Sequence, residues 1–147
     1  MTRLRKFARL PPGGRTLLIR TVFVVAVIRL ALWVLPFRYL RRLLETHFRG
    51  PSGAAWRPME SVAQLVWAVR AAASSVPCAS CLTQAMALHC LLIHAGYVSA
   101  VHIGIAREPR SRIRAHAWVE QAGRPLLTTP VVAAQYTKIA SWPRPPA

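Results

Sequence analysis

Cys81 is the residue in this sequence best placed to act as a nucleophile. Ser80 has the side chain of an N-cap, and the apolar pattern that follows predicts a helix from Cys81 to a C-terminal cap at Gly96. The first turn of a helix presents unpaired N–H groups and the positive end of the helix dipole, and both favour a thiolate. Because the thiolate is the nucleophilic form of cysteine, this position fits covalent catalysis by Cys81.

A cysteine nucleophile needs a base, and His116 is the best candidate. It lies in the run Ala-His-Ala-Trp-Val-Glu at residues 115–120, whose alternation predicts a strand with His116, Trp118 and Glu120 on one face. An imidazole beside the thiol holds the thiolate as an ion pair and later protonates the departing amine. The two residues together predict acyl chemistry of the cysteine-protease type.

Other interpretations of the cysteines are weaker. Cys78 and Cys81 form a C-x-x-C pair, but the segment before it is predicted to be helical, whereas a thioredoxin-like site follows a strand. Zinc binding by Cys78, Cys81, His89 and His94 is disfavoured, because both histidines lie on the helix that starts at Cys81 and the spacing is too short for a finger. A cysteine early in a helix is also commonly a small core residue, and Cys90 is expected to be one.

Composition limits the chemistry further. The chain has 147 residues, which suits one domain, and 54% of them are hydrophobic. There is no Asp, so few carboxylates are available for catalysis by a carboxylate pair or for binding a metal through oxygen. No cofactor is indicated, and any dependence on nucleotide stays open. Three cysteines is an odd number, which fits a reducing, cytoplasmic compartment better than a disulfide framework. The only carboxylates are Glu45, Glu60, Glu108 and Glu120.

The charge is strongly positive. Twenty Lys and Arg against four Asp and Glu give a formal charge of +16. This predicts an anionic partner, such as an acidic lipid surface or an acidic peptide, unless it reflects an arginine-rich codon bias. Nucleic acid is disfavoured, because the sequence has no zinc-finger spacing, no RNP-type aromatic motif and no basic heptads.

The elements that must position Cys81 and His116 follow from periodicity and from turn residues. They predict an α+β fold that is helical first and then forms a short antiparallel sheet. Residues 1–15 are expected to be a flexible basic lead-in, 16–136 a single domain and 137–147 a Pro-rich tail. The predicted helices span about 16–35, 37–48, 60–73 and 81–95, with a loop at 49–58. The predicted strands span 98–106, 115–121 and 125–129, joined by turns at 107–113 and 122–124.

The apolar stretch at 16–35 has three interpretations. It is long enough to span a membrane, but Arg29 lies deep within it, and each Arg near the centre of a span costs about 2.5–3.5 kcal/mol. A signal peptide lacks support, because no small-residue cleavage site follows. We therefore expect a core or surface helix first, a membrane-associated helix second and a signal peptide third.

Several segments together resemble one family. Cys81-Leu82 opens the predicted helix, Gly96 closes it, a Val-His-Ile-Gly-Ile strand follows at 101–105, and the Ala-His-Ala-Trp-Val-Glu run is unbroken. This order resembles the B proteins of lasso-peptide biosynthesis, which belong to the transglutaminase-like, papain-like cysteine proteases. The resemblance extends over roughly residues 17–136 and includes the helical lead around residues 35–44.

The resemblance implies a specific role. Such proteins are leader peptidases: they remove the leader from a ribosomally made precursor peptide, with Cys81 and His116 here matching the catalytic pair. A partner cyclase, similar to asparagine synthetase, then joins the freed core. In the split type a separate leader-recognition protein holds the leader. This sequence shows no recognition element, so it resembles the peptidase half of that arrangement.

One position departs from the family pattern. The family places an Asp on the strand after the histidine, whereas residues 126–129 here read Leu-Leu-Thr-Thr. Thr128, Thr129, Gln135 and Glu120 are the candidate replacements. Glu120 shares a face with His116, but residues four apart on a strand are about 13 Å apart, which disfavours a direct bond. A neutral third member is compatible with catalysis, as the Asn of papain-like proteases shows.

Two other functions use the same features differently. The first is acyl transfer by a transglutaminase relative, in which the Cys81–His116 pair would form a new amide bond. The second is a non-catalytic basic module that binds a membrane or a partner, which the missing Asp and the apolar N-terminal segment favour.

Overall fold

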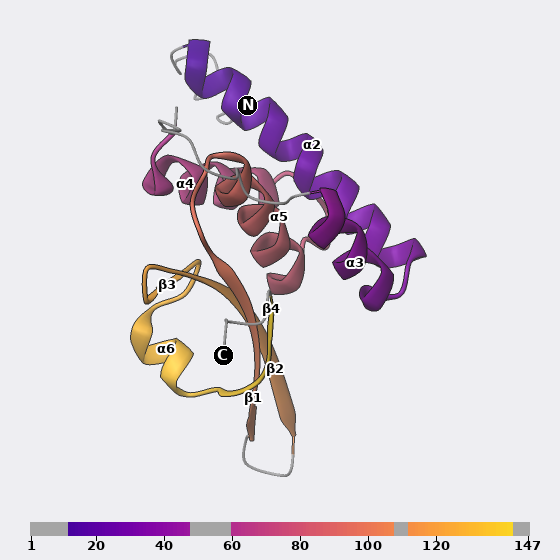
Figure 1. Ribbon diagram of the computed structural model, residues 1–147, viewed down its shortest axis with the longest axis vertical. Coiled ribbons are helices and arrows are strands. Elements are labelled where there is room, and N and C mark those ends of the chain that lie inside the picture. The colour runs from indigo at the N-terminus through magenta and orange to yellow at the C-terminus, as the bar shows by residue number, and fades with distance from the viewer. Residues whose placement is uncertain (1–11, 48–59, 108–111, 143–147) are drawn as a thin grey trace.

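The computed structural model describes residues 12–47, 60–107 and 112–142. The described chain is helical first and then forms a four-stranded antiparallel sheet, with strand order β3-β2-β1-β4 (Figure 1). This confirms the predicted α+β fold. The main core lies where α2, α4, α5 and one face of the sheet meet.

Helix α2 spans Pro12–Val34 and packs against α4 and α5. Leu17, Thr21, Val25 and Ile28 form its buried stripe, because residues three and four apart share a helix face. The helix starts at Pro12 and not near Thr16, so Pro12–Arg15 do not belong to the predicted lead-in. Proline suits a helix start, since its missing N–H would have no partner there. Residues 1–11 lie outside the described residues.

The next two helices agree with the predicted ones to within two residues. Helix α3 spans Phe37–His47 and follows Pro36, and its Leu40 is buried in the core. Helix α4 spans Val62–Ala73, and its N-cap Ser61 forms a capping box with Gln64. The predicted loop at 49–58 and Phe48 lie outside the described residues.

Helix α5 spans Cys81–His94 and is the central helix of the domain. Ser80 is its N-cap, as predicted, and Gly96 follows its end with a φ of 82°, a left-handed conformation that favours glycine. The residues of this helix from Ala85 to Leu92 are all buried, because α2 and α4 cover one side and the sheet covers the other.

The sheet is built around a long hairpin. Strand β1 (Ala100–Arg107) pairs with β2 (Ile113–Gln121), and this register places Gly104 opposite His116 and His102 opposite Trp118. Ala122 and Gly123, both at positive φ, turn the chain into β3 (Arg124–Leu126). The hairpin tip, residues 108–111, lies outside the described residues.

Two predictions about the C-terminal part are wrong. The predicted tail begins with a strand, because β4 (Thr137–Trp142) pairs with β1 at the sheet edge. The domain therefore continues at least to Trp142, which is buried. The predicted strand at 125–129 ends at Leu126, and a short helix, α6 (Pro130–Ala134), follows with Thr129 as its N-cap.

The two faces of the sheet have different neighbours. Val101, Ala117, Val119 and Trp142 belong to the core that the sheet shares with the helices. Because side chains alternate along a strand, His102, His116, Trp118 and Glu120 lie on the opposite face. Tyr136 packs on that second face, where its ring adjoins those of His116 and Trp118.

Candidate active site

The start of α5 is held in place by its cap. The Thr83 N–H donates to Ser80 Oγ at 3.2 Å, and the Gln84 N–H donates to the Ser80 carbonyl at 3.0 Å. A helix leaves its first N–H groups without intrahelical partners, so those of Cys81 and Leu82 point out of the first turn. Cys81 itself is partly exposed, with one side packed against the core. This combination presents a thiol beside backbone donors suited to an anion.

The loop before α5 is also fixed to the helix. Gln84 Nε2 donates to the Ala79 carbonyl at 3.1 Å, and the Ala79 N–H donates to the Val76 carbonyl at 3.4 Å. Cys78 lies in this loop with a φ of 57°, and its side chain is exposed. The two thiols of the C-x-x-C pair therefore occupy different settings, one in a left-handed loop position and one at a helix start.

The three cysteines all lie within the described residues, and each is a free thiol. Cys90 is 2% exposed, and burial raises the pKa of its thiol to about 12. Cys90 is thus the buried core residue that was expected, and Cys81 and Cys78 are the accessible thiols.

His116 is half-buried in β2 and surrounded by aromatic rings. Its ring centroid lies 5.2 Å from that of Tyr136 and 6.1 Å from that of Trp118. Burial, and then the nearby positive charge of Arg114, lower its pKa below the ordinary value. The imidazole is therefore neutral at neutral pH, which is the form that accepts a proton from a thiol. Its Nε2 is buried and has no hydrogen-bond partner within the part of the chain that the structure describes.

Gly104 makes room for the rings beside His116. A Cβ at this position would lie 2.8 Å from the Tyr136 Cβ and 3.0 Å from the Trp118 ring. Only glycine lets these two side chains cross β1 so closely. Tyr136 was not among the residues expected at the site, because it lies in a segment with no regular pattern and reaches His116 only through the fold.

The chain path places the starts of α5 and β2 at the same end of the domain. β1 begins just after α5 ends, and β1 and β2 are antiparallel, so the end of α5 lies near the end of β2. α5 packs along β2, and its start, with Cys81, therefore lies toward the first half of β2, where His116 is (Figure 1). The two predicted catalytic residues are on neighbouring elements.

The two side chains are not hydrogen-bonded to each other. His116 lies on the sheet face opposite the helical core, and no hydrogen bond joins it to Cys81 in the described residues. Catalytic hydrogen bonds are often long or poorly aligned without substrate and tighten when substrate binds. The dyad thus stays a prediction.

Two of the candidate third residues, Glu120 and Thr129, are bonded to groups other than His116. The Glu120 carboxylate accepts from Lys138 Nζ at 2.9 Å and lies 3.4 Å from His102 Nε2. The hydrogen bond from Lys138 is the largest cause that lowers the pKa of Glu120. Thr129 Oγ1 accepts from the Val132 N–H at the start of α6. Thr128 is half-buried beside it, and Gln135 is exposed at the end of α6.

His102 belongs to a polar cluster on the second face of the sheet. Its Nδ1 lies 2.7 Å from Ser141 Oγ, and its Nε2 faces Glu120. Burial, and then the charge of Lys138, lower the pKa of His102, while Glu120 opposes this shift. The sequence left His102 open between core and cleft. The structure places it at 7% exposure in this cluster, where cross-strand pairing fixes it.

The transglutaminase-like superfamily matches residues 23–141, which include all of α5, strands β1 to β3 and all of β4 except Trp142. The chain therefore belongs to the transglutaminase-like superfamily, which includes cysteine peptidases and acyltransferases. No curated protein and no solved structure matches the chain significantly.

Proposed function

We propose that this protein is a cysteine peptidase that removes the leader from a lasso-peptide precursor, with Cys81 as nucleophile and His116 as base. The observation that carries the proposal is the position of Cys81, the first residue of the capped central helix of a transglutaminase-like domain. The choice of a lasso precursor as substrate rests on the sequence motif from Cys81 to Glu120.

The proposed reaction proceeds through a thioester. Neutral His116 accepts the thiol proton, and Cys81 Sγ attacks the carbonyl carbon at the junction of leader and core. Backbone N–H groups in the first turn of α5 stabilise the resulting oxyanion. The C–N bond then breaks, and imidazolium gives its proton to the departing amine of the core. Water, deprotonated by His116, cleaves the thioester, which releases the leader carboxylate and restores the thiol.

The proposal includes partners. A separate leader-recognition protein would present the precursor, and a cyclase similar to asparagine synthetase would take up the freed core. All of these steps would take place in the cytoplasm, where the free thiols persist.

The central test is cleavage of the precursor in the presence of the recognition protein, followed by mass spectrometry. Wild type should release leader and core, and Cys81→Ala should lower the rate by at least about 10⁴-fold, since it removes the nucleophile. Cys78→Ala is the matched control and should keep most of the activity, because Cys78 lies outside the helix start. Cleavage by the Cys81 variant at the wild-type rate would rule out this assignment.

The His116 role is tested by the reactivity of the thiols themselves. Iodoacetamide labelling at pH 7, mapped by mass spectrometry, should modify Cys81 faster than Cys78 in the wild type. His116→Ala should slow the labelling of Cys81 and leave that of Cys78 unchanged, because the proposal pairs His116 with Cys81 alone. Equal labelling of Cys81 in both proteins would exclude His116 as its base.

A non-catalytic role is the second candidate. It is favoured by the missing Asp and by the lack of a hydrogen bond between Cys81 and His116 in the described residues. If the precursor binds but neither wild type nor variant cleaves it, the binding role is the better one. A product with a new amide bond in the same spectra would instead identify an acyltransferase.

A further inference from the structure

The outer side of α2 carries an apolar stripe without a partner in the described structure. The buried stripe of this helix faces α4 and α5, and the side chains on its opposite side point outward. Trp33 is 79% exposed and Phe23 is 68% exposed, which is unusual for such large apolar groups. The outer stripe consists of Ile19, Phe23, Val27, Leu30, Trp33 and Val34.

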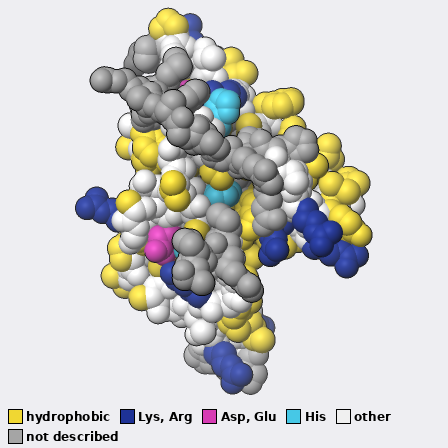
Figure 2. Space-filling view, viewed as in Figure 1, with side chains coloured by type: hydrophobic (Ala, Val, Ile, Leu, Met, Phe, Trp, Pro, Cys, Tyr) yellow, Lys and Arg dark blue, Asp and Glu magenta, His cyan; other side chains and the backbone are white. Residues whose placement is uncertain are grey.

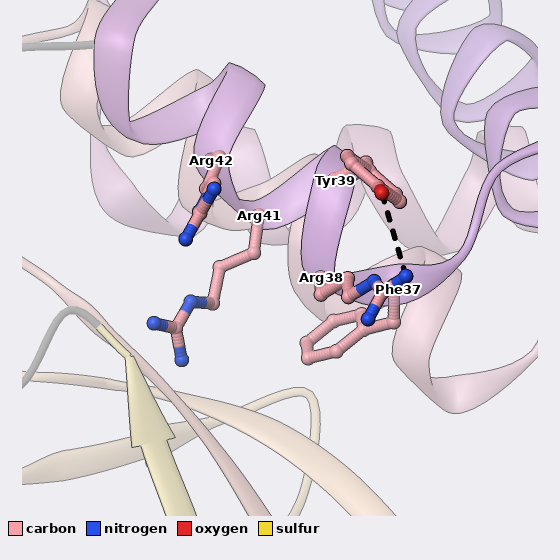
Figure 3. Close-up of a pocket in the computed structure, with 5 residues that line it drawn as sticks. All are labelled: Phe37, Arg38, Tyr39, Arg41 and Arg42. Atoms are coloured by element: carbon pink, nitrogen blue, oxygen red, sulfur yellow. Dashed lines mark hydrogen bonds between the residues drawn. The ribbon is translucent and has the colours of Figure 1, made fainter.

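Three arginines lie on α3, the helix that follows the C-terminal end of α2. Helix α3 follows α2 directly, and Arg38, Arg41 and Arg42 line a pocket of about 360 Å³ together with Phe37 and Tyr39 (Figure 3). The Arg38 guanidinium lies over the Tyr39 ring, 4.8 Å from its centroid. Figure 2 shows hydrophobic and Lys or Arg side chains next to each other at the edge of the molecule where α2 and α3 lie.

The charges of these helices are nearly all positive. α2 contains Arg15, Arg20 and Arg29 and no acidic residue, and α3 contains one carboxylate, Glu45. A soluble surface helix usually presents polar residues on its outer side, whereas this one presents apolar residues with basic residues at the flanks and the end. α2 is apolar on its inner side as well, which the domain core covers, so only its outer side and the basic residues around it are available to the interface of an anionic bilayer.

Packing argues against the alternative of a helix that crosses the bilayer. By length and composition α2 is long and apolar enough to do so. However, Thr21 and Val25 are fully buried against the other helices, and the Arg20 guanidinium binds Glu60 at 3.2 Å. A spanning α2 would have to leave this core and carry Arg20 and Arg29 into the hydrocarbon. Any contact of this helix with a membrane would therefore be made through its outer side only.

We propose that the outer stripe of α2 and the arginines of α3 dock this protein on the surface of an anionic lipid bilayer. The apolar side chains enter the boundary between headgroups and acyl chains, with Trp33 at the level that tryptophan prefers. The arginines bind lipid phosphates. A protein partner is less favoured. It would have to place many acidic groups opposite these arginines, whereas the centre of a protein interface is usually depleted of charged residues. The proposal stands independently of the peptidase proposal.

The first test measures binding of the full chain to vesicles by co-sedimentation. Vesicles of phosphatidylcholine with 30% phosphatidylglycerol should bind the wild type, and vesicles of phosphatidylcholine alone should bind it at least tenfold more weakly. The double variant Phe23→Glu with Trp33→Glu should lower the affinity on the order of a hundredfold, since two large apolar groups no longer enter the bilayer. Ile139→Glu, on exposed β4, is the matched control and should bind as wild type does.

A second variant tests the charges. Replacing Arg38, Arg41 and Arg42 with Gln should lower the affinity for anionic vesicles on the order of a hundredfold at low salt, and less at high salt. Circular dichroism and thermal melting should show that each variant is folded. Wild-type affinity in either variant, or equal binding of the wild type to both kinds of vesicle, would overturn the proposal. So would a failure of the wild type to bind either kind, which would leave the stripe to a protein partner.

Alkaline carbonate extraction separates docking from spanning. A protein held by one side of α2 should be released from the vesicles at high pH, because its other side stays in the domain core. Retention in the membrane fraction would show that α2 crosses the bilayer, and would overturn docking at the surface.

Discussion

At the scale of single residues, burial sets the state of the histidines. His89 lies on α5 and is buried. Its Nδ1 is hydrogen-bonded to Ser99 Oγ, and its ring centroid lies 4.7 Å from that of Trp142. Burial alone lowers its pKa to about 4. His116 and His102 are less enclosed, but burial is also the largest cause that lowers their pKa values. All three are therefore neutral in the folded protein at neutral pH.

This predicts that the protein loses stability in mild acid. An unfolded histidine titrates near its ordinary pKa of about 6.5. Between that pH and about 4, His89 therefore binds a proton in the unfolded chain but stays neutral in the folded protein. The stabilisation is fully present above pH 6.5 and is lost as the pH falls toward 4, by about 3 kcal/mol for His89. Urea unfolding at pH 7.5 and 4.5 measures this difference.

His89→Gln is the variant that isolates this contribution. It should reduce the loss of unfolding free energy between the two pH values. His102 and His116 should account for the pH dependence of the unfolding free energy that remains, which should be smaller and of the same sign. The slope is the readout, because the substitution also changes the packing at both pH values. An unchanged slope would show that His89 is not the group responsible.

The sequence singled out some of the candidate site residues and could not single out others. Cys81 and His116 stand out because a helix start and an alternating strand are local patterns. Tyr136 and Lys138 reach the second face of the sheet only because β4 pairs with β1, and that pairing joins residues far apart in the chain. The partners of Glu120 were therefore not predictable from its own surroundings in the sequence.

At the scale of elements, the start of α5 depends on its cap. Ser80→Ala leaves the Thr83 N–H without its acceptor and should cost about 1 kcal/mol of unfolding free energy. The first turn should then fray more, and labelling of Cys81 by iodoacetamide should change while that of Cys78 does not. Urea unfolding and peptide mapping provide the two measurements.

Ser75→Ala is the control for the cap. Ser75 is exposed and lies between α4 and α5, outside both helices. Its replacement should leave the unfolding free energy within about 0.5 kcal/mol of wild type. A similar loss in both variants would mean that the loop, and not the cap, stabilises the start of α5.

Helices were easier to predict than the edges of the sheet. The ends of α3, α4 and α5 agree with the sequence because caps and the 3.6-residue period are local signals. β4 was missed because most of its residues are exposed and its register shifts between Ile103 and Gly104. Because of these two features, the sequence of β4 lacks the regular alternation of apolar and polar residues by which a strand is recognised.

At the scale of the whole molecule, α2 is part of the domain and not an appendage. Val25 is fully buried where α2 meets α4 and α5. Val25→Ala should therefore cost about 2 kcal/mol, from lost burial and the cavity left behind. Phe23→Ala, on the outer stripe, should change stability by less than about 0.5 kcal/mol. Thermal or urea unfolding of the two variants measures the contrast, and equal effects would show that α2 does not stabilise the core through its inner side.

The order of the layers, with α2 first, then α5 and then the sheet, also determines the orientation that the molecule would have on a membrane. α5 packs on the inner side of α2, and the axes of neighbouring helices in proteins are usually about 8–10 Å apart. The β1–β2 hairpin extends from the other side of this pair, away from α2 (Figure 1). A molecule docked through α2 would thus hold the Cys81 thiol about one helix layer above the lipid, with the sheet turned toward the aqueous phase. A peptide arriving from solution would reach the thiol without entering the bilayer.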